Sequence, residues 1–327
     1  MTRSRITGTG GYLPAKVLTN KDLESLVETS DDWIVSRTGI RERHIAADNE
    51  FTSDLALHAS RKALDMAGRS TADVDLIVLA TSTPDMVFPS SACLLQAKLG
   101  VKKGAAFDVQ AVCSGFVYAL STADLYVRSG QYRCALVIGA EVFSRILDWK
   151  DRGTCVLFGD GAGAVLLAPD DAPGRGILST HLYADGNFTD VLYQPAGGSR
   201  EPPSAATVAE KRHFVKMNGR EVYKQAVRNM AAASKAALDA NGLTPGDVSW
   251  VIAHQANIRI IEGVSERVGI GMERFYINVD RYGNTSSASV PTALDEAIEM
   301  KKVKEGDLLI FSALGGGLAW ASAAVRW

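Results

Sequence analysis

The chain has 327 residues, and its 35 Lys and Arg nearly balance its 37 Asp and Glu, which leaves a net charge of −2. A near-neutral chain has no bulk attraction for nucleic acid or for an anionic membrane surface, so we expect neither as a partner. The length predicts roughly two domains of about 150 residues, each able to bury a large core.

The four cysteines, Cys93, Cys113, Cys134 and Cys155, lie among apolar or small residues and form no Cys-x-x-Cys pair. This pattern argues against a metal site and a disulfide framework, and it favours a reducing compartment. The N-terminus lacks a signal-peptide pattern, and no apolar run is long enough to span a bilayer. We therefore expect a cytoplasmic protein without bound metal.

The first half of the chain alternates helical and strand patterns. Apolar residues at helical spacing predict a helix over 54–67, and short apolar runs predict buried strands at 76–80 and 105–109. A second helix is expected from about Cys113 to Tyr126, followed by strands near 134–139 and 158–165. This alternation indicates an α/β fold.

The second half repeats the first. Ala-Ser-Arg-Lys-Ala-Leu-Asp at 59–65 recurs as Ala-Ser-Lys-Ala-Ala-Leu-Asp at 233–239, and each copy then enters an apolar strand, at 76–80 and at 250–253. A period this long indicates two homologous domains rather than a solenoid. The alternative is a chance similarity between two helix–strand units.

Turn-forming residues suggest where the halves meet. Asp-Asp-Ala-Pro-Gly at 170–174 is the best boundary, which predicts one half over 1–172 with the nucleophile and another over 173–327. The stretch 195–204, with two glycines and two adjacent prolines, is predicted to be a surface excursion within the second half.

Cys113 is the first candidate catalytic residue. It follows the strand at 105–109 at the point where a helix is expected to begin, in Ala-Val-Cys-Ser-Gly-Phe. A thiol at a helix N-terminus faces the positive end of the helix dipole, so we expect a lowered pKa and a nucleophilic thiolate. The alternative is a packed core cysteine, the commonest fate of a free cysteine.

His254 and Asn284 are the partners predicted for this cysteine. His254 ends the strand at 250–253, and Asn284 lies in the segment that corresponds to the Cys113 turn in the repeat. Together they can donate two hydrogen bonds to one thioester oxygen and stabilise an enolate. The alternatives are a structural histidine and a helix N-cap. The three glycines at 315–317 allow the backbone to approach the nucleophile closely.

Five segments resemble one known family, the β-ketoacyl-acyl-carrier-protein synthases III. They are Asp-Trp-Ile-Val-Ser-Arg-Thr-Gly-Ile-Arg-Glu-Arg at 32–43, Ala-Val-Cys-Ser-Gly-Phe at 111–116, Val-Leu-Phe-Gly-Asp-Gly-Ala at 156–162, His-Gln-Ala-Asn at 254–257 and Gly-Asn-Thr-Ser at 283–286. The resemblance implies a thiolase fold with two layered α-β-α-β-α halves and five-stranded mixed sheets, usually as a homodimer. It also implies the first condensation of type II fatty-acid synthesis.

Roles follow from the same resemblance. Cys113 would accept an acyl group, most simply acetyl, from acyl-CoA, and His254 and Asn284 would act on malonyl-acyl-carrier protein as carbon dioxide leaves. Backbone N–H groups of Cys113 and Gly316 would form an oxyanion hole. Asn284 separates this group from the elongating synthases, which use two histidines. Acyl-CoA is a substrate here, so no cofactor is implied.

Binding residues also follow from matched positions. Trp33, Arg37 and Arg152 match residues that hold the adenine and phosphates of CoA, where a base can stack between Trp33 and Arg152. Phe88 matches a residue that lines the acyl pocket across the dimer interface, and its ring favours a short primer. The stretch 195–204 is longer than is usual in the family.

A basic stripe is predicted to dock the acidic acyl carrier protein. Arg220, Lys224 and Arg228 are four residues apart on an expected helix, and Arg259 and Arg267 follow His254 on another. The alternative is a solvated helix face.

Three other functions compete with this interpretation. One is a secondary-metabolite condensing enzyme of the same fold that uses another acyl-CoA. Another is a cysteine hydrolase, because Cys, His and Asn occur in the papain-like order, although the repeat and the missing Cys-Gly-Ser-Cys-Trp-type signature oppose it. The last is a non-catalytic scaffold of the thiolase fold.

Overall fold

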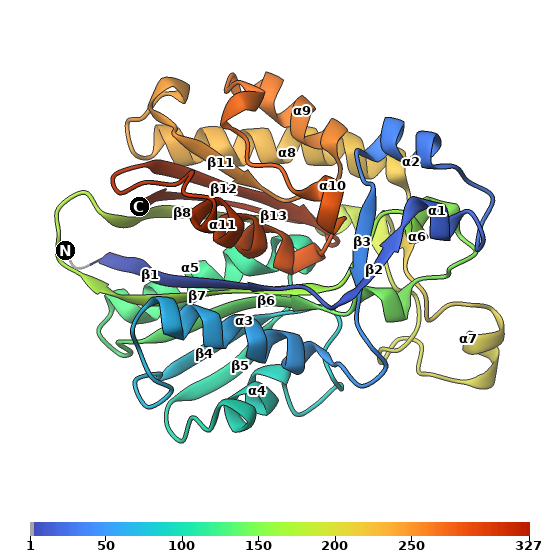
Figure 1. Ribbon diagram of the computed structural model, residues 1–327, viewed down its shortest axis with the longest axis horizontal. Coiled ribbons are helices and arrows are strands. Elements are labelled where there is room, and N and C mark those ends of the chain that lie inside the picture. Colours follow the sequence, from blue (N-terminus) through green and yellow to red (C-terminus); the bar gives the residue numbers. More distant parts are fainter. Residues whose placement is uncertain (1–2) are drawn as a thin grey trace.

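The computed structural model describes residues 3–327 and contains two stacked β-sheets with helices between and outside them (Figure 1). The first sheet has the strand order β1-β7-β6-β4-β5. Its strands are β1 (Arg3–Tyr12), β4 (Leu76–Ala80), β5 (Ala105–Val109), β6 (Ala135–Glu141) and β7 (Gly161–Asp170). β4 runs parallel to β5 and β6, and β7 runs antiparallel to both β6 and β1.

The second sheet has the same order and orientation as the first. Its strands are β8 (Gly176–Ala184), β11 (Trp250–Ala253), β12 (Leu308–Gly315) and β13 (Ala319–Arg326), in the order β11-β12-β13-β8. β11 is parallel to β12, and β13 is antiparallel to β12 and β8. The first sheet draws on residues 3–170 and the second on 176–326, so each sheet comes from one copy of the repeat.

One expectation needs correction, because the second sheet has four strands among the described residues rather than five. The edge beside β11 holds only a parallel bridge between Val251 and Phe275. Tyr276 donates its N–H to the Val251 carbonyl, but its own carbonyl accepts from the Gln255 side chain. The Gln255 side chain also accepts from the N–H of Asn278. The side chain of Gln255 therefore takes backbone hydrogen bonds that a fifth strand would make with β11.

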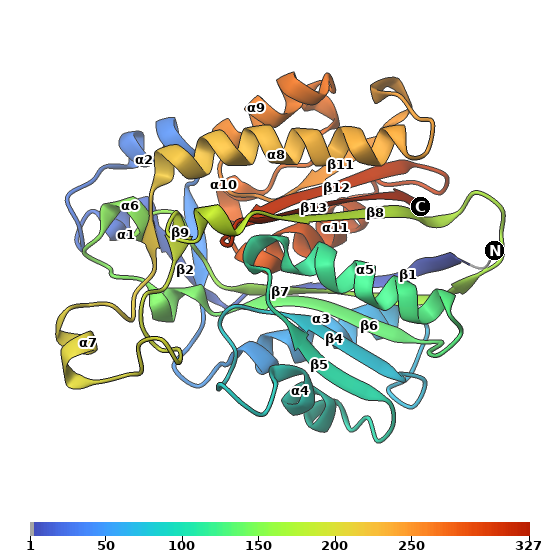
Figure 2. The same ribbon diagram turned by 180° about the vertical axis from the view of Figure 1, so that it is seen from behind.

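The layers follow the order α-β-α-β-α that the resemblance implied. α3 (Thr52–Met66) and α4 (Ser91–Leu99) cover the outside of the first sheet, and α8 (Gly219–Asp239) and α9 (Ile258–Val268) cover the second. α5 (Gly115–Arg128) and α11 (Ser289–Glu299) lie between the sheets. Figure 2 shows α5 and α8 from the opposite side.

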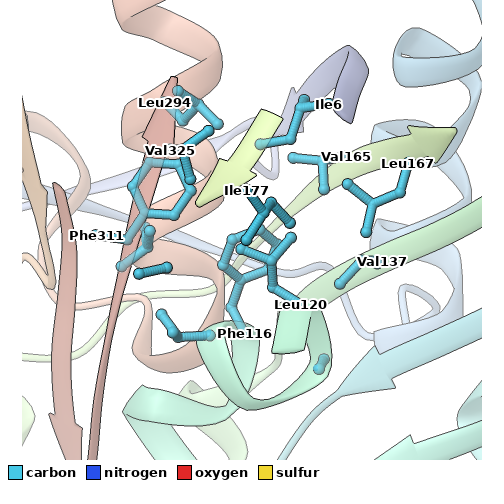
Figure 3. Packing of buried hydrophobic residues seen from close by; sticks show 14 of the residues in the cluster. Ile6, Phe116, Leu120, Val137, Val165, Leu167, Ile177, Leu294, Phe311 and Val325 are labelled. Carbon is cyan, nitrogen blue, oxygen red and sulfur yellow. The ribbon is translucent and has the colours of Figure 1, made fainter. Parts of the chain in front are cut away.

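The largest core cluster fills the space between the two sheets (Figure 3). Ile6 from the first sheet, Phe116 from α5, Leu294 from α11 and Phe311 from the second sheet are all buried in it. Strands covered on both faces need continuous apolar runs, and every residue of β4 and β6 is buried. The two halves therefore share one core, which fixes their sheets relative to each other.

Gly8 and Gly10 show how closely the outer layer packs. A Cβ atom on either glycine of β1 would collide with backbone carbonyl oxygens of α3, at Ala63 and Ala59 respectively. These glycines therefore allow α3 to pack closely against β1.

Short elements form a rim at one end of the two stacked sheets. They are β2 (Lys16–Thr19), α1 (Asn20–Leu23), α2 (Asp31–Thr38), β3 (Glu42–Ile45), α6 (Arg152–Cys155), β9 (Leu192–Tyr193), α7 (Ala205–Ala209), β10 (Lys216–Met217) and α10 (Val279–Tyr282). The stretch 195–204 precedes α7, which projects away from the layered body (Figure 1). Among residues 3–327, no helix is long and apolar enough to cross a membrane.

Candidate active site

The structure brings Cys113, His254 and Asn284 together in one cavity of about 600 Å³. Trp33 and Arg37 line the same cavity, together with apolar side chains from the rim and from α8. The three predicted catalytic residues come from both halves of the chain, so neither half alone contains the site. The cavity is mostly apolar with a few convergent polar groups, as is usual for small-molecule sites.

Cys113 lies on the short 3₁₀ helix η1 (Val112–Ser114), which joins β5 to α5. Its side chain is only 2% exposed. The preceding residue, Val112, has a φ of +49°, an uncommon conformation for a β-branched residue. Gly315 packs against this turn, because a Cβ there would lie 2.5 Å from the backbone nitrogen of Cys113.

The expected low pKa of Cys113 is wrong for the resting site. Burial raises the pKa of this thiol to about 12, while a hydrogen bond with Ser286 lowers it and the Glu141 charge raises it further. Desolvation disfavours the thiolate more than the neighbouring donors favour it. Cys113 is therefore a neutral thiol before substrate arrives, and its proton must leave when it attacks.

The hydrogen bonds around His254 are compatible with a ring that carries its proton on Nε2. Its Nδ1 lies 3.0 Å from Oγ of Ser289, and that oxygen also accepts the backbone N–H of Gln255 at 2.6 Å. The Ser289 hydroxyl can donate its own proton to Nδ1, and in that arrangement Nε2–H is a donor. Burial lowers the pKa of His254 to about 3, so the imidazole is neutral.

The side-chain amide of Asn284 is oriented in a similar way. Its Oδ1 accepts the backbone N–H of Ser286 at 2.9 Å, so its NH₂ group remains to donate into the cavity. The backbone of Asn284 bonds both Leu157 and Gly159 across a parallel bridge centred on Phe158. The asparagine therefore stabilises the turn before η6 (Ser286–Ala288) and also presents a donor.

Gly316 does not line this cavity in the described residues, although its predicted role concerns its backbone N–H. A Cβ at Gly316 would lie 2.5 Å from the carbonyl oxygen of Leu192, so this glycine permits a close contact with the rim. The contribution of Gly316 to an oxyanion hole stays a prediction. Of the three glycines predicted to let the backbone approach the nucleophile closely, Gly315 is the one that packs on the Cys113 turn.

The predicted CoA residues lie together, and two of them, Trp33 and Arg37, line the cavity. The guanidinium groups of Arg37 and Arg152 lie 4.7 and 4.6 Å from the centre of the Trp33 ring, and Arg152 donates to the Glu28 carbonyl. Arg152 is already in stacking contact with the ring, so a base can enter between them only if Arg152 moves. The three residues form a cationic aromatic platform that suits a nucleotide phosphate.

Phe88 lies outside the cavity of its own chain. It is 82% exposed and follows the exposed Met86 and Val87. A role in lining an acyl pocket would thus require a second copy of the chain. That role and the homodimer stay predictions.

The five basic residues of the predicted docking stripe are exposed on α8 and α9. Arg220 and Arg259 also line the cavity, whereas Lys224, Arg228 and Arg267 do not. Lys224 forms an ion pair with Glu221 at 3.6 Å. The two cavity-lining arginines place positive charge where a substrate on a long arm would enter.

Three polar residues of this site, Glu141, Ser286 and Ser289, were not predicted from the sequence. Glu141 ends a completely buried strand, and a charged residue there is a signal that could have been noticed. The two serines belong to the polar run after Asn284, but sequence alone does not indicate what they face. Among residues 3–327, no cluster of His, Cys, Asp and Glu is arranged to hold a metal ion.

Comparisons with known proteins show the family that this chain resembles. Residues 107–186 match the family described as 3-oxoacyl-[acyl-carrier-protein] synthase III, and residues 238–327 match its C-terminal part. A β-ketoacyl-[acyl-carrier-protein] synthase III of Rhodospirillum centenum is 57% identical over 99% of both chains.

Solved structures extend the similarity. The crystal structure of 3-oxoacyl-[acyl-carrier-protein] synthase III from Aquifex aeolicus has a TM-score of 0.92 and 47% identity, and covers 99% of this chain and 100% of that one. The priming β-ketosynthase of the R1128 polyketide biosynthetic pathway has a TM-score of 0.92 at 34% identity, over 99% of this chain and 96% of that one.

Proposed function

Because the chain belongs to the 3-oxoacyl-[acyl-carrier-protein] synthase III family, we propose that Cys113 accepts the acyl group of the reaction that this family performs. The enzyme is an acyltransferase that condenses a short acyl-CoA with malonyl-acyl-carrier protein in the initiating step of type II fatty-acid synthesis. The products are a 3-oxoacyl-carrier protein, CoA and carbon dioxide. The residue roles that follow are our assignments.

The first half-reaction loads the cysteine. The sulfur of Cys113 attacks the thioester carbonyl of acyl-CoA, and the CoA sulfur leaves with a proton, so that an acyl-cysteine remains. The negative charge on the carbonyl oxygen is stabilised by the N–H groups of Cys113 and Gly316. Trp33, Arg37 and Arg152 hold the nucleotide end of CoA at the mouth, where two guanidinium groups already lie over the Trp33 ring.

The second half-reaction forms the carbon–carbon bond. Nε2–H of His254 and the amide NH₂ of Asn284 donate to the thioester oxygen of the malonyl group as it loses carbon dioxide. The resulting enolate attacks the acyl-cysteine, and Cys113 leaves as the thiolate. The single observation that carries this assignment is that both donors have their remaining polar atoms engaged by Ser289 and Ser286, so both are preset as donors.

The neutral histidine also weakens the hydrolase alternative. A papain-like mechanism uses histidine as the base for cysteine, and a base with a pKa of about 3 accepts a proton poorly near neutral pH. A secondary-metabolite condensing enzyme remains a second candidate, because the similar priming β-ketosynthase belongs to a polyketide pathway. The two functions differ only in the acyl-CoA and carrier that are used.

The remaining assignments concern partners and organisation. The acyl carrier protein docks on Arg220, Lys224, Arg228, Arg259 and Arg267, which are exposed on α8 and α9 and of which Arg220 and Arg259 line the cavity. The enzyme acts as a homodimer in which the exposed Phe88 of one copy limits the acyl pocket of the other, which favours acetyl. The halves 1–172 and 173–327 are the two units of the repeat, no cofactor takes part, and the compartment is the cytoplasm.

One experiment tests this function directly. The enzyme is incubated with a series of acyl-CoA thioesters, and the acyl group retained on Cys113 is identified by intact mass and peptide mapping. Malonyl-carrier protein is then added, and the carrier-bound product is identified. We expect acetyl to be retained best and a 3-oxobutanoyl-carrier protein to form; retention of a long or branched acyl group instead would favour the secondary-metabolite enzyme.

A further inference from the structure

Glu141 is a fully buried carboxyl group beside the nucleophile for which the mechanism above has no use. It ends β6, the central strand of the first sheet, and is 0% exposed. Its oxygens accept from the Thr83 hydroxyl at 2.6 Å, the Ser287 hydroxyl at 2.9 Å, the Ser82 backbone N–H at 3.1 Å and the Ser286 hydroxyl at 3.2 Å.

The partners of Glu141 suit its ionised form. The Ser82 N–H can only donate, and the Thr83 hydroxyl already accepts the Val142 N–H, so its proton points at the carboxylate. A carboxylate that accepts several such bonds tolerates burial without a cationic partner. Burial still raises the pKa of Glu141 above its usual value, which makes this group a better proton acceptor than an ordinary glutamate.

Ser286 connects this carboxylate to the nucleophile. Its hydroxyl donates to Glu141 at 3.2 Å, and Cys113, whose pKa this hydroxyl influences, lies on η1, the turn that contacts η6. Its backbone is held at a φ of +50°, and its N–H is held by Asn284. The serine is thus fixed in place by the same turn that orients the catalytic amide.

We propose that Glu141 accepts the proton of Cys113 through the hydroxyl of Ser286 while the cysteine is acylated. This inference rests on the proposed role of Cys113 as the acyl acceptor. Glu141 touches no substrate, so it acts through Ser286 and Cys113 as a positioned proton acceptor.

The transfer is balanced in atoms and charge. The Cys113 S–H proton moves to Oγ of Ser286, the Ser286 proton moves to Glu141, and the sulfur forms its bond to the thioester carbon. When the bond between that carbon and the CoA sulfur breaks, the CoA sulfur takes a proton back from Ser286. Glu141 then returns its proton to Ser286, so the relay ends as it began and free CoA carries the proton away.

His254 also lies in the cavity with Cys113, and it is a poorer proton acceptor than Glu141. Its Nδ1 is occupied by Ser289, its Nε2 already holds a proton, and burial lowers its pKa to about 3. The charge of Glu141 raises the pKa of Cys113. The side chain of Glu141 faces uncharged partners: Thr81, Ser82, Thr83, Ser286 and Ser287. The relay therefore provides the base that a buried neutral thiol needs.

The internal repeat shows that only the first copy has a carboxylate at this position. The spacing that relates β4 to β11 also relates Glu141 to Gly315. At Gly315 the absent side chain makes room for the Cys113 turn, whereas Glu141 bonds the opposite turn at Ser286 and Ser287. Gly315 thus leaves space for the turn that carries the nucleophile, and Glu141, at the equivalent position of the first copy, supplies the base.

The test compares Ser286→Ala, Glu141→Gln and Glu141→Asp with Ser287→Ala, a matched control. Ser287 bonds the same carboxylate from the same turn but has no place in the path between Cys113 and Glu141. Single-turnover acylation of Cys113 by acetyl-CoA is followed by intact mass from about pH 6 to about pH 9. Decarboxylation of malonyl-carrier protein by the unacylated enzyme is measured in parallel, and thermal melting checks folding.

We expect Ser286→Ala and Glu141→Gln to slow acylation at neutral pH by about 10²-fold, the usual contribution of a general base. Their rates should rise steeply with pH, because hydroxide then removes the thiol proton, and Glu141→Asp should recover part of the loss. Ser287→Ala should lose no more than about fivefold, the value of one hydrogen bond. Decarboxylation should be retained by Ser286→Ala, since Asn284 is held by the Ser286 backbone N–H.

Two results would overturn the relay while leaving the proposed function intact. One is acylation of Ser286→Ala at the wild-type rate and with the wild-type pH profile. The other is equal damage by Ser287→Ala and Ser286→Ala, which would make the carboxylate a clamp for the turn. If wild-type enzyme is acylated at a residue other than Cys113, the proposed function fails together with the relay. If Glu141→Gln does not fold, Ser286→Ala decides alone.

Discussion

Val112 and Ser286 adopt the same rare backbone conformation, with φ values of +49° and +50°. Each begins a 3₁₀ turn that leads into one of the two helices between the sheets, η1 into α5 and η6 into α11. The turns contact each other, so the two copies of the repeat meet where Cys113 and Asn284 lie. Strain of this kind persists where the surrounding structure holds it, and it is frequent at functional sites.

The first prediction concerns the acyl acceptor. Cys113→Ala should abolish both the acyl-enzyme and the condensation, because Cys113 is the cysteine in the cavity. Replacing Cys93, Cys134 or Cys155 by alanine should retain acylation; Cys93 is exposed and the other two are buried elsewhere. Intact mass after incubation with acetyl-CoA measures this. An adduct mapped to any of those three cysteines would refute the assignment.

The second prediction separates the two half-reactions. His254→Ala and Asn284→Ala should each slow carbon dioxide release from malonyl-carrier protein by about 10²–10³-fold, the usual loss for one oxyanion donor. Both variants should still form measurable acyl-Cys113, because the cysteine gives its proton elsewhere. Labelled malonyl and intact mass follow the two steps independently. His181→Ala, on β8 and outside the cavity, is the matched control. Blocked acylation with normal decarboxylation in His254→Ala would make histidine the base instead.

The third prediction tests the docking stripe. Lys224→Glu and Arg259→Glu should raise the KM for malonyl-carrier protein by about fivefold at low salt, as expected for an exposed charge contact. Acyl-CoA loading should change little, and added salt should shrink the difference from wild type because it screens exposed charges. Lys235→Glu, exposed on α8 outside the stripe, should behave as wild type. Equal loss in both half-reactions would point to misfolding or CoA binding.

The fourth prediction concerns stability at acid pH. The folded imidazole of His254 stays neutral down to a pKa of about 3, whereas an unfolded histidine takes up a proton near pH 6.5. The unfolded state therefore binds more protons below about pH 6.5, so the native state loses stability as pH falls from there. Between about pH 7 and pH 5 the loss amounts to about 2 kcal/mol.

Denaturant unfolding at the two pH values measures this loss. His254→Gln lacks the titrating group, so it should lose less stability than wild type by that amount. The buried carboxyl groups are present in both proteins, so their contribution to the pH dependence cancels in the difference. Equal losses in the two proteins would show that His254 is protonated in the folded state.

Much of the fold could be predicted from the sequence because it depends on local patterns. The repeat, the buried strands and the helices at 54–67 and after Cys113 follow from apolar periodicity, and the structure places β4, β5, β6, α3 and α5 there. The missing fifth strand of the second sheet could not be predicted. It depends on the Gln255 side chain, which takes the hydrogen bonds that a neighbouring strand would make.

The sequence by itself determined which residues can do chemistry: a cysteine at a strand–helix turn, a histidine that ends a strand and an asparagine in the matching turn. Only the tertiary structure decided the state of those residues. Burial makes Cys113 a neutral thiol and His254 a neutral imidazole, and Ser289 and Ser286 select which atoms donate. Protonation depends on solvent exclusion, and the proton position on His254 depends on Ser289, 35 residues away, so a linear pattern reveals neither.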